Sequence, residues 1–119
     1  MQIEIIIDGQ HFTATLRDSA ATRDLIGQLP QIVQMRDHGG VEKTGRLRSA
    51  LSLEGQPSGA DPAVGDVGYY APSHDLVLYY GDQSYYEGIV VLGHLDGDAA
   101  PQLARIAGSV SADVRRSDG

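Results

Sequence analysis

Apolar and polar residues alternate along much of this chain and predict a protein made mainly of β-strands. Four of residues 2–7 are isoleucines, and in residues 11–16 every second side chain is apolar, which places Phe12, Ala14 and Leu16 on one face. Asp8-Gly9 lies between these two runs and is typical of a tight turn, because glycine adopts positive φ without a steric clash. The first sixteen residues are therefore expected to form a β-hairpin.

A change of period after the hairpin predicts a short helix over residues 20–29. Every fourth residue from Ala21 to Leu29 is apolar, which forms one stripe along a helix. Ser19 precedes the stripe and offers a side-chain oxygen to the free N–H groups of a helix start. Pro30 follows it and is expected to end the helix.

The rest of the chain is expected to contain more strands, one long connection and a second helix. The expected strands cover residues 31–36, 67–71, 75–80, 89–95 and 109–114. Residues 37–65 hold six glycines and two prolines and predict an irregular connection, with one short strand or turn near Leu47. A short helix is expected over residues 98–107, and a polar tail over residues 115–119. About seven strands and two short helices favour one domain, residues 1–114, built as a small closed or nearly closed β-barrel.

Composition and charge narrow the classes of partner. The chain has 119 residues, a net charge of -7 and a sequence pI of about 4.8. An acidic surface repels phosphate backbones, so nucleic acid and anionic membranes are not expected partners. The chain has no cysteine, which excludes disulfides, thiolate catalysis and Cys-ligated metal centres.

The N-terminus and the hydropathy pattern favour a cytoplasmic location. The first residues lack a basic leader, a long apolar core and a small-residue cleavage site. No apolar run approaches the roughly 20 residues that span a bilayer.

The aromatic residues point to one candidate binding face. All tyrosines fall in three adjacent pairs, Tyr69-Tyr70, Tyr79-Tyr80 and Tyr85-Tyr86. Neighbours on a strand face opposite sides, so each strand pair should place one ring inward and one outward. Two interpretations remain open: one ring of each pair packs in the core beside a surface ring, or the rings line a face for a flat or apolar ligand or a peptide. Tyr69 and Tyr79 are the candidate stacking residues.

Four further side chains are candidate polar contacts. Glu42 and Lys43 follow two glycines in the long connection, and Asp82 follows the second tyrosine pair. His94 lies in an apolar strand, where it is either a hydrogen-bonded structural residue or an acid/base at the barrel mouth. No pair of histidines has a recognisable metal-ligand spacing, so neither a metal nor a cofactor is expected.

Four segments carry a resemblance to a known family: HFTATLRDSAATRDLIGQLP, MRDHGGVEK, GDVGYYAPSHDLVLYYGD and GIVVLGHLDG. In this order they resemble the small bacterial and archaeal cyclophilin-like proteins, a family largely of unknown function. The resemblance runs from about Ile3 to Leu103. It implies a mainly β fold: a small antiparallel cyclophilin-like β-barrel with two short helices.

The resemblance does not bring a complete prolyl isomerase site with it. True cyclophilins use an arginine beside a wall of Phe, Trp, Met, Leu and His, whereas this chain has no Trp and only Phe12. Arg36 or Arg46 is a candidate for the arginine, with no flanking motif to choose between them.

Three hypotheses about function follow, and the first is favoured. The chain is expected to be a noncatalytic module that binds a small molecule or a peptide. The alternative is an enzyme, either a weak peptidyl-prolyl isomerase or a barrel that uses His94 or Glu42 as acid/base. A third possibility is a homodimer that buries exposed tyrosines, in place of a monomer.

Overall fold

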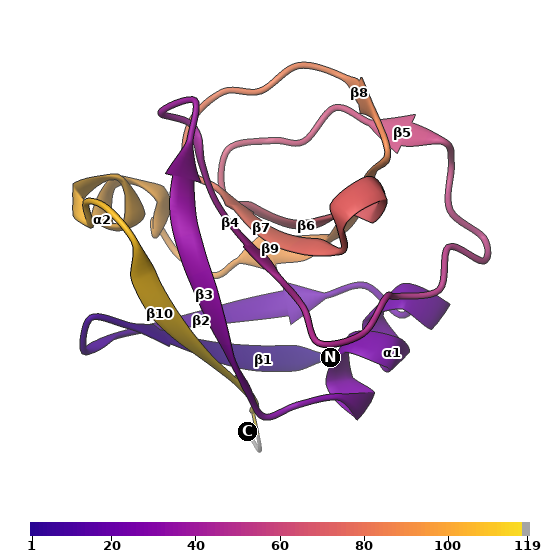
Figure 1. Cartoon of the computed structure of the whole chain (residues 1–119), viewed down its shortest axis with the longest axis horizontal. Coiled ribbons are helices and arrows are strands. Elements are labelled where there is room, and N and C mark those ends of the chain that lie inside the picture. Colours follow the sequence, from indigo (N-terminus) through magenta and orange to yellow (C-terminus); the bar gives the residue numbers. More distant parts are fainter. Residues whose placement is uncertain (118–119) are drawn as a thin grey trace.

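Eight antiparallel strands close into a barrel in the computed structural model, which describes residues 1–117 (Figure 1). Around the barrel the strand order is β1-β10-β3-β4-β7-β6-β9-β2. The barrel strands are β1 (Gln2–Ile7), β2 (Gln10–Leu16), β3 (Gln31–His38), β4 (Glu42–Arg46), β6 (Asp66–Tyr70), β7 (Asp75–Tyr79), β9 (Ile89–Leu95) and β10 (Val110–Arg116). The expected mainly β barrel with two short helices is confirmed.

Two helices and a small separate sheet complete the fold. They are α1 (Ala20–Gly27), α2 (Ala100–Arg105), the 3-10 turn η1 (Ala71–Ser73), and the two-stranded sheet of β5 (Gly59–Ala60) and β8 (Tyr86–Glu87). Figure 1 shows α1 and α2 on opposite sides of the barrel, and β5 and β8 on the side away from both termini. Within residues 1–117, no helix is long and apolar enough to cross a membrane.

The first hairpin and α1 form as their sequences predict. Ile7 pairs with Gln10, and both residues between them have positive φ, 51° for Asp8 and 74° for Gly9. That conformation matches the right-handed twist of the two strands. At the start of α1 the Ser19 hydroxyl oxygen accepts a hydrogen bond from the Thr22 N–H at 3.1 Å, which satisfies one of the free donors of the first turn.

The long irregular connection is shorter than the sequence indicated. β3 continues to His38, so the irregular segment begins later than predicted. β4 lies inside residues 37–65 and ends directly before Leu47, near which one short strand or turn was expected, although residues 42–46 were not themselves predicted as a strand. The reason lies in the composition of β4, whose inward positions hold Lys43 and Gly45 instead of apolar side chains. A strand without apolar alternation gives no period-two signal.

The C-terminal strand is also longer than expected. β10 extends through Arg116, which pairs with Ile3, so two residues of the predicted polar tail belong to the barrel. The last two residues of that tail, 118–119, lie outside the described part of the chain.

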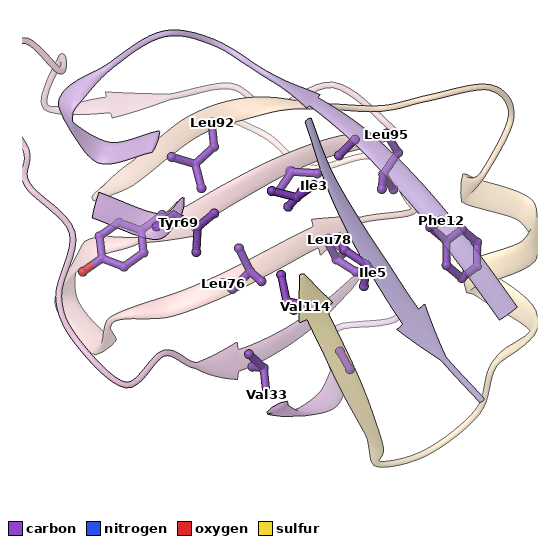
Figure 2. Packing of buried hydrophobic residues seen from close by; sticks show 14 of the residues in the cluster. Ile3, Ile5, Phe12, Val33, Tyr69, Leu76, Leu78, Leu92, Leu95 and Val114 are labelled. Atoms are coloured by element: carbon purple, nitrogen blue, oxygen red, sulfur yellow. The ribbon is translucent and has the colours of Figure 1, made fainter. Parts of the chain in front are cut away.

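Side chains from most barrel strands fill the interior and exclude water. Figure 2 shows Ile3 and Ile5 of β1, Leu76 and Leu78 of β7, and Tyr69 of β6 among the buried residues. α1 and α2 add Leu25 and Leu103, neither of which is exposed. Burying this apolar surface is the main favourable contribution to folding.

Candidate functional site

The two tyrosine-bearing strands, β6 and β7, use opposite faces for their two buried tyrosines. Tyr69 is 1% exposed and packs with the barrel interior, beside its cross-strand partner Leu76. Tyr79 is equally buried but belongs to a separate cluster with Val77 and Ile89. Because Leu76 and Val77 are neighbours on one strand, this second cluster lies on the outer face of the barrel wall.

The Tyr79 ring lies against the backbone of β6 at Gly68. A Cβ atom at residue 68 would fall 2.7 Å from Tyr79 Cε2 and 3.3 Å from its hydroxyl oxygen. Any larger residue at this position would displace the ring. Gly68 therefore provides the recess into which the Tyr79 ring packs on the outside of the sheet.

A pocket opens over this ring on the outer face. Its volume is about 350 Å³. The lining residues come from β3, β4, β6, β7, β8, β9 and the segments between them: Arg36, His38, Glu42, Thr44, Tyr70, Ser73, Asp75, Tyr79, Gln83, Tyr86 and Ile89. A volume near 300 Å³ is the lower end of the range for small-molecule sites.

Strand pairing explains why residues far apart in sequence meet in the pocket. His38 pairs with Glu42, and Glu42 pairs in turn with Tyr79. These three residues form one row across the strands, and in the next row on the same outer face Arg36 pairs with Thr44. Residues in one such row stand side by side on the same face of a sheet. The register thus places an acid, an imidazole, a guanidinium and a phenol around one recess.

Hydrogen bonds and aromatic contacts hold the pocket walls. Gln83 Nε2 donates to Glu42 Oε1 at 3.2 Å, which ties the segment after β7 to β4. Thr44 Oγ1 donates to Asp75 Oδ2 at 3.1 Å. The rings of Tyr70 and Tyr86 have centroids 6.1 Å apart and planes tilted by 59°, within the range of favourable aromatic pairs. Through this contact β8 covers one side of the pocket.

The electrostatic environment of Tyr79 is negative. Burial raises the pKa of the Tyr79 phenol above its ordinary value of 10.0, and the nearby carboxylates of Glu42 and Asp66 raise that pKa further. Within residues 1–117 the Tyr79 hydroxyl has no hydrogen-bond partner, and every fully buried side-chain polar atom there has one. The Tyr79 hydroxyl therefore reaches the open space of the pocket as a neutral group, free to donate and accept.

Lys43 belongs to a different cluster, on the inner side of β4. Its ammonium is fully buried, donates to Asp37 Oδ1 at 2.8 Å and to the Ile106 carbonyl oxygen, and lies 5.5 Å from the Tyr80 ring centroid. The Tyr80 hydroxyl also donates to Asp37 Oδ1, at 3.2 Å. Both hydrogen-bond acceptors of the ammonium lie within the protein, so Lys43 ties β4 to the end of α2, and it is not among the residues that line the pocket.

The six candidate residues from the sequence are only partly brought together. Glu42 and Tyr79 line the pocket. Tyr69 is inside the barrel, where its hydroxyl accepts a hydrogen bond from the Leu51 N–H at 3.1 Å. Asp82 is exposed and lies outside the lining. His94 is on the outer face of β9, where Nδ1 is 2.8 Å from Asp66 Oδ1.

Sequence reasoning did not select most of the lining residues. Arg36 was considered as a cyclophilin arginine, and Tyr70 and Tyr86 were counted in tyrosine pairs without being chosen. His38 and Asp75 were not selected, because only the pairing of β3 with β4 and of β4 with β7 brings them to the pocket. Gln83 follows β7 and is held at the pocket by its hydrogen bond to Glu42. In the described part of the chain no three His, Asp or Glu residues are arranged to hold a metal ion.

Comparison with known proteins agrees with this architecture. The sequence pattern of the cyclophilin-like family matches residues 5–115. The chain belongs to the cyclophilin-like family.

Two solved structures are similar to it in fold. One is the hypothetical protein AF2241 from Archaeoglobus fulgidus, with a TM-score of 0.78 and 20% identity over 98% of this chain and 95% of that one. The other is McbB in complex with tryptophan, with a TM-score of 0.74 and 14% identity. That match covers 98% of this chain but 45% of McbB. Among curated proteins, none matches.

Proposed function

We propose that this protein is a noncatalytic binding module for a small organic molecule, held in the pocket over Tyr79. The observation that carries the proposal is the recess itself: a buried ring packs against Gly68 and lines a pocket of about 350 Å³. Ligand sites of this kind combine apolar or aromatic walls with a few polar groups that fix orientation.

The size of the pocket favours a small molecule over a peptide. About 350 Å³ accommodates a compound built on one or two rings. Tyr79, Tyr70 and Ile89 offer apolar surface, while Glu42 and Arg36 offer charged groups. Binding of tryptophan by McbB, a protein of similar fold, is consistent with a ligand that has a flat ring.

A screen of single-ring fragments, followed by ¹⁵N chemical-shift mapping, tests the proposal. Bound fragments should shift amides of β4, β7 and β8 together. Tyr86→Ala should weaken this binding without loss of structure, because Tyr86 is 58% exposed and contributes to the pocket wall. The exposed Tyr85 provides a matched control, since it lies outside the lining. Shifts confined to other surfaces, or equal effects of Tyr85→Ala and Tyr86→Ala, would contradict the proposal.

Prolyl isomerisation is the second candidate, and one observation favours it. Arg36, one of the two arginines considered from the sequence, lies on the rim of the pocket, whereas Arg46 lies outside the lining. An isomerase would show a rate above background with a proline-containing model peptide, and this rate would be lost in Arg36→Ala but retained in Arg46→Ala. Absence of any rate above background would leave the binding module as the function of the pocket.

A further inference from the structure

Two carboxylates line the pocket without a cationic partner. Glu42 and Asp75 are both partly buried, and among the described residues neither forms an ion pair. Each accepts a side-chain hydrogen bond only from a neutral donor: Glu42 from the Gln83 amide, and Asp75 from the Thr44 hydroxyl. A carboxylate has about four lone-pair positions, so both retain acceptor capacity that faces the pocket.

Tyr79 adds an independent indication at the same place. Tyr79 is 1% exposed, yet its hydroxyl has no partner within residues 1–117 and lines the pocket together with Glu42. The Coulombic influence on this phenol comes from the carboxylates of Glu42 and Asp66. The bottom of the pocket therefore combines an aromatic ring, a free hydroxyl oxygen and a negative potential.

We propose that the ligand of this pocket carries an ammonium group on an aromatic or apolar body, with the ammonium bound by Glu42 and the Tyr79 hydroxyl. This inference rests on the proposed function and names the chemical class of its ligand. An ammonium donates to a carboxylate and a phenol oxygen at once. The rings of Tyr79, Tyr70 and Tyr86 attract a cation through their faces and cover its apolar body.

The positive groups of the pocket do not neutralise this position. Arg36 and His38 are on β3, the strand at the rim, and both are exposed. His38 is the direct cross-strand neighbour of Glu42 but forms no ion pair with it among the described residues. Arg36 shares its cross-strand row with Thr44, one row away from Glu42 and Tyr79. The guanidinium forms no ion pair with either lining carboxylate in the described residues.

Three probes that share one aromatic ring test the inference: 2-phenylethylammonium, 2-phenylethanol and 3-phenylpropionate. Each is titrated into ¹⁵N-labelled protein at physiological ionic strength, where nonspecific attraction to the acidic surface is screened. The cation should bind at least about tenfold more tightly than the alcohol, because a hydrogen bond to a charged group exceeds a neutral one by roughly this factor. The anion should bind most weakly.

A matched pair of variants separates the site from the net charge. Glu42→Gln keeps the size of the side chain and an oxygen for the Gln83 amide, and should reduce the preference for the cation over the alcohol to less than about threefold. Glu54→Gln removes the same charge from an exposed position outside the lining and should leave the preference unchanged. The inference would be overturned if the alcohol or the anion bound in the pocket as tightly as the cation. It would also be overturned if the preference for the cation survived in Glu42→Gln. Either result would leave the proposed function intact. If no probe shifts pocket residues, both proposals fail.

Discussion

The Tyr79 ring packs against Gly68 so closely that a Cβ atom at residue 68 would lie 2.7 Å from Tyr79 Cε2. The position of the ring therefore depends on the absence of a side chain at Gly68. The two residues are on adjacent strands, and the ring fills the space that any other residue would occupy. This relationship distinguishes Tyr79, on the outer face, from Tyr69, whose ring is part of the barrel core.

Gly68→Ala should move the Tyr79 ring and deform the pocket. The added methyl group would also lie 3.1 Å from the Val90 carbonyl oxygen, so some strain would remain even after the ring had shifted. We expect a loss of about 1–3 kcal/mol in the free energy of unfolding, measured by urea denaturation, together with weaker binding of fragments. Gly27→Ala is the control: nothing lies within 4 Å of its added Cβ, so stability should be unchanged or slightly raised. Equal effects of the two changes would contradict this interpretation of Gly68.

The two buried tyrosine hydroxyls should differ in their contribution to stability. Tyr69→Phe removes the acceptor of the buried Leu51 N–H and should cost about 1–3 kcal/mol. Tyr79→Phe removes a hydroxyl without a protein partner among residues 1–117 and should change the free energy of unfolding by less than about 1 kcal/mol. The reverse order in equilibrium denaturation would show that the assignment of inner and outer tyrosines is wrong.

The Lys43–Asp37 pair should respond unequally to loss of either partner. The Lys43 side chain is not exposed, whereas that of Asp37 is 35% exposed. Asp37→Ala leaves a buried ammonium without its carboxylate and should cost about 3 kcal/mol. Lys43→Met leaves a carboxylate that water can reach, so the cost should be lower by at least about 1 kcal/mol. If the two variants lost equal stability, or if Lys43→Met lost more, an unpaired buried charge would not be the main cause of the destabilisation.

Alkaline pH should destabilise the protein partly through Tyr79. Burial and the neighbouring carboxylates raise the folded-state pKa of this phenol above 10.0, its ordinary value. The contribution of Tyr79 to stability is then complete below pH 10 and is lost as pH rises through the higher folded-state pKa. Tyr79→Phe should therefore lose stability less steeply above pH 10 than the wild type, in denaturation curves measured from pH 8 upward. Parallel pH profiles would contradict the raised pKa.

The sequence predicted the barrel better than it predicted the site. The isoleucines of β1, the Asp8-Gly9 turn and the Ser19 cap are local signals, and each is present as expected. β4 has no such signal, because its inward side chain is a lysine whose charge is compensated by Asp37. Burial of a charge through a partner outside the strand cannot be read from the strand's own residues.

The site depends on register, which the sequence does not show. Alternation predicted that one tyrosine of each strand pair would face outward, and Tyr70 and Tyr79 do so. It did not indicate which face was outside, so Tyr69 was selected together with Tyr79. Lys43 and Glu42 are adjacent in sequence, but the same alternation places them on opposite sides of the barrel wall.

A crystal structure with the most tightly bound ring-containing fragment tests the central claim most directly. The protein offers a competing cavity where β3 begins and β10 ends, lined by residues that include Pro30, Ile32 and Arg116. We expect ligand density between Tyr79 and Tyr86, with a polar ligand atom within hydrogen-bond distance of the Tyr79 hydroxyl. Ligand density confined to the competing cavity, with the space over Tyr79 filled only by water, would contradict the account.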